Sequence, residues 1–349
     1  MTPFQPSAPS AVAAETLAQL GEWELIRRLG IYANPGQFAD DAALLMPPAG
    51  QALVVTTDVL VEGVHFSDAT TAPGDVGWRA AAANLSDLAA MGCTEVVGLT
   101  VGLVAPAATP WAWVEGVYGG LLDALTAYGG DLLGGDCSGG GQRLLAITAL
   151  GSLAADGGPI RRRDGRPGDW LVASGPHGLS RLGLALLQGV AAGEAPAGGL
   201  DPGLPERAVA AHQRPLPRFD AVRALIASRP AGTAWRVGGC DSSDGLAAAL
   251  RAIATASGCA ARLERGALPL DPAMAKLSQA EAWCLGGGED FELVLALEPA
   301  WAGALVESMP GMTVIGRLET GDRAGHLGWS DGSPWPAAAS GIGGFQHFG

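Results

Sequence analysis

The sequence predicts an α/β protein, of the α+β type, with two domains of comparable size. Segments of strand character alternate with helical segments in both halves of the chain, as in this fold class. The chain has 349 residues, 48% of them hydrophobic, so it can bury more core than one domain usually holds. Its character shifts near Ala154. We therefore expect a disordered leader at 1–14, an N-terminal domain at 15–153 and a C-terminal domain at 154–349.

The first half of the chain opens with helical apolar spacing over Glu15–Leu29. The apolar start of Ala52–Phe66 predicts a strand that turns polar at Thr56. The remaining expected elements are helices over Pro73–Met91 and Trp111–Tyr128, a short strand from Asp131 running into a glycine-rich loop that ends at Gly141, and a strand over Leu144–Leu153.

The second half begins with an arginine triplet, Arg161–Arg163, which usually marks a solvated edge but can also reach a phosphate. Residues 190–204 have the Ala, Gly and Pro composition of a loop. The expected elements are strands over Trp170–Ser174, Leu293–Leu297 and Met312–Arg317, and helices over Gly178–Gly189, from Arg214–Arg218 onward, and over Leu246–Ser257.

Composition excludes several classes of protein. The net charge of −14 argues against a nucleic-acid partner, because phosphate backbones need a basic face. The five cysteines lack CxxC spacing, which favours free thiols in a reducing compartment. No signal peptide is evident, and the uncharged segment 96–114 is interrupted by glycines and prolines, which argues against a membrane span. We expect a soluble, cytoplasmic protein.

Acidic residues recur at the ends of apolar segments, beside Gly, Ser, Thr or Asn. The central stretch, Ala52–Phe66, places Thr56, Thr57 and Asp58 after a strand, with Glu62 and His65 in the following loop. The other acidic positions are Asp40-Asp41, Asp87, Asp136, and Asp241 with Asp244. One shared metal and phosphate site explains all of them. Taken singly, each has an ordinary alternative: a solvated turn at Asp40-Asp41, a common glycine loop at Asp136, and a helix cap at Asp241–Asp244.

Phosphate chemistry without a phosphate-binding lysine suits this composition. The chain has no GxxxxGK[ST] motif, and its 21 basic residues comprise twenty Arg and the single Lys276. A nucleotide enzyme of this kind must neutralise phosphate charge with Mg²⁺, Arg and backbone amides. No GxSxG or HExxH motif indicates another chemistry, although carboxylates acting as in glycosidases are compatible with the sequence.

Five segments resemble thiamine-monophosphate kinases, which belong with aminoimidazole ribonucleotide synthetase and selenophosphate synthetase in one superfamily. They are TTDVLVEGVHF (56–66), NLSDLAAMG (84–92), GGD (134–136), DSSDGL (241–246) and GGGEDFEL (286–293). The likeness runs from about Gly21 to Phe348. It implies a two-domain synthetase-like fold whose N-terminal domain has a mixed sheet and helices, binds ATP and Mg²⁺ and forms the interface of a homodimer. The C-terminal α/β domain would close the active site.

The resemblance also implies ATP-dependent phosphorylation of thiamine monophosphate to the diphosphate by direct in-line transfer, assisted by several Mg²⁺ ions. It implies catalytic roles for Asp58, Asp136 and Asp244. The residues expected to hold Mg²⁺ are Asp41, Thr56, Thr57, Asp58, Asp87, Asp136, Asp241 and Asp244. The residues expected to contact ATP are Gly135, Asp136, Arg163 and Ser243, and those expected to contact thiamine monophosphate are His65, Glu289 and Ile342.

The sequence departs from the family's pattern in three places: Ala39 replaces a glycine, Cys137–Gly140 replaces a segment with threonine and arginine, and Ile342 replaces an aromatic residue. Two alternative functions follow. One is another ATP-dependent enzyme of the superfamily acting on a different small acceptor, which the Ile342 substitution slightly favours and the absence of the synthetases' lysine-bearing glycine motifs disfavours. The other is a nucleotide-binding dimer without catalysis, which the complete set of acidic residues disfavours.

Overall fold

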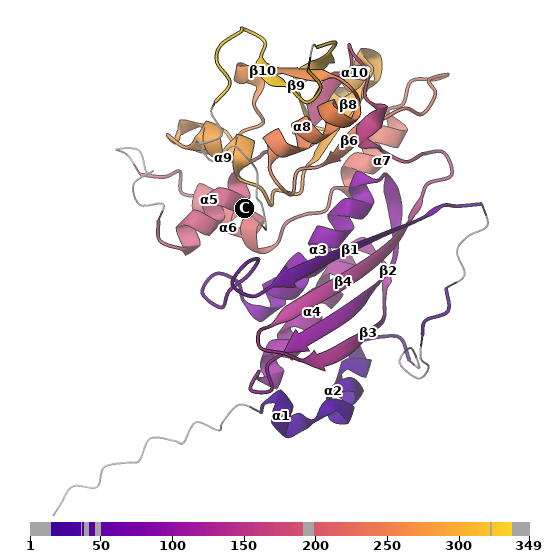
Figure 1. Cartoon of the computed structure of the whole chain (residues 1–349), viewed down its shortest axis with the longest axis vertical. Helices are drawn as coiled ribbons and strands as arrows, with labels where there is room; N and C mark the ends of the chain where they lie inside the picture. The colour runs from indigo at the N-terminus through magenta and orange to yellow at the C-terminus, as the bar shows by residue number, and fades with distance from the viewer. Residues whose placement is uncertain are drawn as a thin grey trace, which may run out of the picture.

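The computed structural model describes residues 15–35, 37, 42–45, 50–190, 199–321 and 323–336. These residues form a four-stranded sheet from the first half of the chain and a six-stranded sheet from the second, each packed against helices (Figure 1). Both sheets are mixed, and antiparallel pairs outnumber parallel ones in each. The expected two-domain α/β architecture with an N-terminal mixed sheet is therefore confirmed.

The N-terminal sheet has the strand order β1-β4-β2-β3. Its strands are β1 (Leu53–Val61), β2 (Cys93–Ala105), β3 (Asp131–Gly139) and β4 (Leu144–Leu153). Strand β4 lies antiparallel to both β1 and β2, and β2 pairs parallel with β3. The helices α3 (Pro73–Ala90) and α4 (Trp111–Tyr128) cover one face. On the opposite face Val55 and Val59 of β1 are 66% and 43% exposed.

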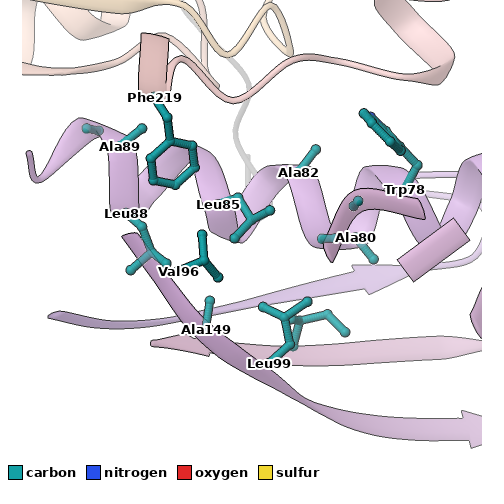
Figure 2. Packing of buried hydrophobic residues seen from close by; sticks show 14 of the residues in the cluster. Trp78, Ala80, Ala82, Leu85, Leu88, Ala89, Val96, Leu99, Ala149 and Phe219 are labelled. Carbon is teal, nitrogen blue, oxygen red and sulfur yellow. The ribbon is translucent and has the colours of Figure 1, made fainter. Parts of the chain in front are cut away.

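Helix α3 lies between the two domains. Leu85 and Leu88 are fully buried on its sheet side, with Val96, Leu99 and Ala149 beneath them, whereas Phe219 of the C-terminal domain packs on its other side (Figure 2). One continuous hydrophobic core therefore spans both domains. This sandwiched position makes α3 the element that can place side chains against both sheets at once.

The C-terminal sheet has the order β10-β7-β9-β5-β8-β6. Its strands are β5 (Trp170–Ala173), β6 (Gly238–Asp241), β7 (Ala260–Leu263), β8 (Leu293–Leu297), β9 (Thr313–Glu319) and β10 (Leu327–Trp329). The helices are α5 (Leu179–Leu187), α6 (Leu204–Gln213), α7 (Phe219–Ala227), α8 (Leu246–Ala256), α9 (Ala280–Gly286) and α10 (Pro299–Ser308). Short 3₁₀ turns lie at Gly30–Tyr32, Arg162–Asp164, Arg265–Ala267 and Met274–Lys276.

The local predictions were wrong or incomplete in two respects. The helix expected over Glu15–Leu29 is two helices, α1 (Leu17–Leu20) and α2 (Glu22–Leu29), because Gly21 adopts a φ of 75° that interrupts helical hydrogen bonding. The sequence did not predict the helices α6, α9 and α10 or the strands β6, β7 and β10. Each of these strands is only three or four residues long. Within the parts described, no helix is long and apolar enough to cross a membrane, and the cytoplasmic location stays a prediction.

Candidate functional site

Four carboxylates from both domains gather around α3. Asp58 comes from β1, Asp87 from α3, Asp241 from the end of β6, and Asp244 from the turn before α8. Asp58 is close enough to Asp87 and Asp244 to feel their charges, and Asp241 likewise feels Asp87 and Asp58. We refer to these four residues as the acidic group. The sequence predicted all four as ligands of one site, and the structure brings them together.

Neutral side chains fix the acidic group in place. The Thr56 hydroxyl donates to Asp87 Oδ2 at 2.5 Å, which places β1 against α3. Asn84, one helical turn before Asp87, accepts from the Asp58 N–H at 2.9 Å through its Oδ1. Ser86 on α3 donates to Asp241 Oδ2 at 2.8 Å and so joins the two domains. Asp58, Asp87 and Asp241 are therefore each linked to a partner on a different element.

The electrostatics of the acidic group favour a bound cation. Burial, and then the neighbouring carboxylates, raises the pKa of Asp58 to about 6 and that of Asp241 to about 6. Burial also raises the pKa of Asp87, and the hydrogen bond from Thr56 and the charge of Arg162 oppose that rise. Carboxylates held together at this cost are stabilised by a divalent cation, which restores their low pKa values.

The donor set fits Mg²⁺ that is also bound to phosphate. Among the described residues, no three His, Cys, Asp or Glu side chains converge closely enough to hold a metal ion on their own. Mg²⁺ commonly takes only one or two carboxylates from the protein and completes its octahedral shell with water and substrate phosphates. The acidic group, with oxygen donors only, suits that mode of binding.

A cleft with a volume of 640 Å³ lies beside the acidic group. It is lined by Thr56, Asp87, Asp241 and the arginines Arg161–Arg163, which lie in and next to the 3₁₀ turn Arg162–Asp164. Arg163, which was predicted to contact ATP, lines this cleft, and the contact itself stays a prediction. Arg162, which attracts Asp87, was not predicted, because nothing in a run of three arginines distinguishes one from the next.

Thr57 and Asp136 lie apart from the acidic group. Thr57 points to the opposite face of the sheet, where its hydroxyl is 2.8 Å from that of Thr148, because successive strand residues alternate in direction. The register aligns Asp58 with Gly135 across two intervening strands. Three strand spacings separate β1 from β3, or roughly 14 Å.

Gly135 and Asp136 instead line a cavity of 400 Å³ with Gln37 and Tyr118, neither of which was predicted. The segment expected to be a glycine-rich loop continues as strand β3 to Gly139. Glycine is required at 135, since a Cβ there would lie 2.0 Å from the Val101 carbonyl oxygen. Next to Asp136, burial raises the pKa of the Cys137 thiol to about 11, so this cysteine is not a reactive thiolate at neutral pH.

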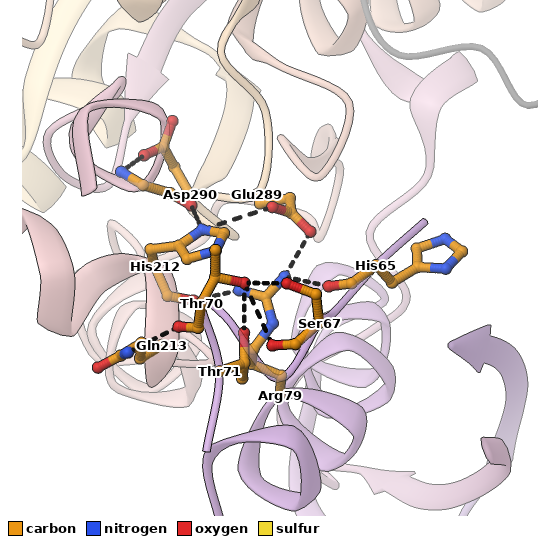
Figure 3. Close-up of polar contacts among 10 residues, drawn as sticks. His65, Ser67, Thr70, Thr71, Arg79, His212, Gln213, Glu289 and Asp290 are labelled. Atoms are coloured by element: carbon orange, nitrogen blue, oxygen red, sulfur yellow. Dashed lines mark hydrogen bonds and ion pairs between the residues drawn. The ribbon is translucent and has the colours of Figure 1, made fainter. Parts of the chain in front are cut away.

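The predicted acceptor-site residues His65 and Glu289 meet at one buried arginine. Arg79 of α3 donates to Glu289 Oε1 at 2.6 Å and to the His65 carbonyl oxygen at 3.3 Å (Figure 3). His65 lies in the turn after β1, where its Nδ1 accepts from the Val61 N–H at 3.0 Å, so Nε2 carries the ring proton in the neutral form. Ser243, predicted to contact ATP, accepts from the Glu289 N–H at 2.7 Å through its carbonyl oxygen.

Arg79 was missed, although a lone arginine within an Ala-rich helix expected to be buried was a usable signal. Two predicted residues, Asp41 and Ile342, lie outside the described residues.

Comparison with known proteins gives consistent matches over nearly the whole chain. Residues 39–153 match the family model "AIR synthase related protein, N-terminal domain", and residues 166–327 match the corresponding C-terminal domain. A thiamine-monophosphate kinase of Prochlorococcus marinus is 45% identical over 345 residues, covering 96% of this chain and 98% of the relative. A thiamine-monophosphate kinase of Synechococcus elongatus is 48% identical over 304 residues, covering 87% of this chain and 90% of the relative.

Solved structures resemble the chain over similar lengths. The crystal structure of thiamine-monophosphate kinase from Stenotrophomonas maltophilia matches with a TM-score of 0.72 and 32% identity, covering 88% of this chain and 95% of the other. The chain in "AaThiL complexed with AMPPCP and TMP" matches with a TM-score of 0.69 and 26% identity, covering 95% and 98%. A hydrogenase maturation protein, HypE, with a TM-score of 0.65 at 20% identity, shares the fold alone.

Proposed function

Because this chain belongs to the thiamine-monophosphate kinase family of AIR synthase related proteins, we propose that it transfers the γ-phosphoryl group of ATP to thiamine monophosphate, forming thiamine diphosphate. The observation that carries this proposal is the acidic group, four carboxylates from two domains beside an arginine-lined cleft. A solved relative, described as bound to AMPPCP and TMP, supports both ligands.

The chemistry needs positioning and charge neutralisation more than proton transfer. The nucleophile is an oxygen of a phosphate monoester whose second pKa is about 6, so it is already largely ionised at neutral pH. In-line attack on the γ-phosphorus then releases ADP without a general base. The residues of the acidic group, with the hydroxyl of Thr56, would hold Mg²⁺, which would supply positive charge to neutralise the phosphate oxygens.

The chain's own residues supply the remaining interactions. Arg162 and Arg163, on the wall of the 640 Å³ cleft, would pair with phosphate oxygens of ATP. Ser243 lies between the acidic group and Glu289, and thus between the proposed ATP and acceptor sites. Glu289 and the His65 turn form the proposed acceptor site, where a carboxylate suits the cationic thiazolium ring of thiamine.

We further propose that the active protein is a homodimer in which a second copy supplies Gly135 and Asp136. Strands β1 and β3 are the two edges of the N-terminal sheet, and each has one side free for pairing. The apolar residues Val55 and Val59 are exposed on the uncovered face. Pairing β1 of one copy with β3 of another would close both edges, cover this face and bring Asp136 of the second copy near Asp58.

The reaction is tested by a steady-state assay with ATP, Mg²⁺ and thiamine monophosphate, with free thiamine in a parallel tube. We expect thiamine diphosphate from the monophosphate and no phosphorylation of thiamine, whose hydroxyl would need a base. No turnover of thiamine monophosphate, with ATP bound, would refute the proposed acceptor and direct attention to the Ile342 substitution.

The shared site is tested by mixing two inactive variants, Asp58→Asn and Asp136→Asn, and allowing their subunits to exchange. Random exchange places half of the protein in mixed dimers, each with one intact site of two, so activity should recover to about a quarter of the wild-type value. If Asp136 acts within its own chain, neither site of a mixed dimer is intact and no activity returns.

A further inference from the structure

Arg79 is a buried cation that contacts three separate segments of the chain. Its side chain is 3% exposed. One terminal nitrogen, Nη2, donates to the Glu289 carboxylate at 2.6 Å and to the His65 carbonyl oxygen at 3.3 Å, while Nη1 donates to the His212 carbonyl oxygen at the end of α6 (Figure 3). Two of these segments belong to the C-terminal domain and the third to the N-terminal domain. Arg79 therefore fixes the distance between these three segments.

The backbone of the turn that carries Glu289 is held in place by contacts that do not involve Arg79. Glu289 and Phe291 adopt left-handed φ values of 57° and 52°, which non-glycine residues rarely occupy. Between them, Asp290 accepts from the Gly178 and Ser180 N–H groups at 2.7 and 3.1 Å, at the start of α5. The backbone of this turn is thus fixed independently of Arg79. What Arg79 determines is the direction of the Glu289 side chain.

The buried positive charge of Arg79 requires the Glu289 carboxylate as its partner. A guanidinium buried in an Ala- and Leu-rich helix needs a carboxylate partner, and Glu289 supplies it. His212 Nδ1 lies 3.7 Å from the other carboxylate oxygen, but burial, and then the charge of Arg79, lowers the pKa of His212 to about 4. His212 is therefore neutral at pH 7 and does not replace Arg79 as a cation.

The Glu289 side chain is still 34% exposed, so part of the carboxylate remains free to meet a ligand. An ionised carboxylate, held rigidly by a cation behind it and partly open in front, is suited to bind a cationic group.

We propose that Arg79 is the positioning residue of the acceptor site: it orients Glu289 and holds the His65 turn at a fixed distance from it, across the boundary between the domains. This inference rests on the proposed function, in which His65 and Glu289 contact thiamine monophosphate. Arg79 itself is covered by the groups it binds and acts through them. Removing it should therefore weaken acceptor binding while leaving the proposed ATP site, about two helical turns further along α3, unchanged.

The test is a double-mutant cycle with Arg79→Met, Glu289→Gln and the double variant, with KM measured separately for thiamine monophosphate and for ATP. Arg79→Met should raise the acceptor KM about tenfold or more in the wild-type background and by less than about threefold in the Glu289→Gln background. The KM for ATP should change by less than about twofold in every variant. Arg79→Lys keeps the charge but not the planar fork, and should restore part of the lost acceptor affinity.

Arg214→Met is the matched control, because Arg214 also joins the domains but lies outside the site. Its side chain donates to Asp75 at 2.6 Å and to Asp123 at 3.2 Å, and is 43% exposed. We expect both KM values of this variant to stay at wild-type levels. Thermal unfolding identifies any Arg79→Met protein that fails to fold, in which case the cycle is run with Arg79→Lys.

The outcomes separate this inference from the proposed function. Wild-type protein that does not turn over thiamine monophosphate refutes the function itself. Active wild-type protein whose variants show additive effects, or equal increases in both KM values, overturns the role of Arg79 and leaves the function standing.

Discussion

Replacing Asp58 by Asn should stabilise the metal-free protein while strongly lowering the kinase activity. Burial and the charges of Asp87 and Asp244 raise the pKa of Asp58 from 3.8 to about 6. A group whose pKa is higher in the folded state contributes stability below its unfolded pKa and loses it as the pH rises through the folded value. Ionised Asp58 therefore destabilises the folded protein above pH 6, and Asn, which is neutral and of the same shape, does not.

The size of the effect follows from that shift. Roughly 2 pKa units at about 1.4 kcal/mol per unit give about 3 kcal/mol. Water reaches the half-buried Asp58 and screens its charge, so we halve this value, to about 1–2 kcal/mol. In the presence of Mg²⁺ and substrates, loss of the carboxylate should lower kcat by about 10²–10³-fold, as for the removal of one contact to the charge of a transition state.

The assay is urea unfolding in EDTA at several pH values, alongside the kinase assay with Mg²⁺. At pH 8 the free energy of unfolding of Asp58→Asn should exceed that of the wild type, and the difference should shrink below pH 6 and vanish near pH 4. Asp136→Asn is the control: Asp136 is exposed and outside the acidic group, so this variant should lose activity without gaining stability. The reasoning would be refuted if Asp58→Asn were less stable than the wild type at pH 8, or if Asp136→Asn gained as much.

Three further predictions concern the surroundings of the site. Thr56→Ala removes a hydrogen bond to charged Asp87 and should raise the Mg²⁺ concentration that gives the half-maximal rate roughly tenfold. Thr57→Ala should change this concentration less, because the Thr57 hydroxyl contacts Thr148 on the other face of the sheet. Titrating the rate with Mg²⁺ compares the two variants. Arg143 donates to Glu62, before His65, and to Asp68, after it, and so holds the turn that carries His65. Arg143→Met should therefore raise the acceptor KM by up to about tenfold, and an unchanged KM would exclude this role. Burial lowers the pKa of His177 to about 4, so the wild-type protein loses stability as the pH falls from 6.5 to 4. In urea titrations at pH 4–6.5, His177→Gln should reduce the slope of that decline by up to about 1.4 kcal/mol per pH unit. Parallel stability curves for the two proteins would contradict this role of His177.

The sequence predicted the elements with the strongest local signals. The helix Trp111–Tyr128 and the strands Leu144–Leu153 and Leu293–Leu297 have the predicted bounds. Helix α3 ends one residue earlier than predicted, at Ala90. These segments are long or strongly apolar, so their local preference agrees with their burial. Strand β6, by contrast, is Gly238–Asp241, whose two glycines have little strand preference. It forms because pairing with β8 determines its conformation.

The acidic group was predictable as a set because its members share one local context, but its geometry was not. Sequence spacing placed Asn84 and Asp87 on one helical face, and both do face β1. It could not show that Asp136 lies three strands from Asp58 within one chain, because strand order is a property of the sheet. Nor could it pair Arg79 with Glu289, which are 210 positions apart.

The position of α3 explains why the proposed ATP and acceptor sites can be assigned to different turns of one helix. Its residues at Ser86 and Asp87 face the acidic group, and Arg79, two turns earlier, faces Glu289. Because the helix is packed between both sheets, these side chains cannot move relative to one another without disturbing the core. In the proposed reaction, the rise of a rigid helix would therefore set the spacing between the phosphate donor and the acceptor, as an in-line transfer without a general base would require.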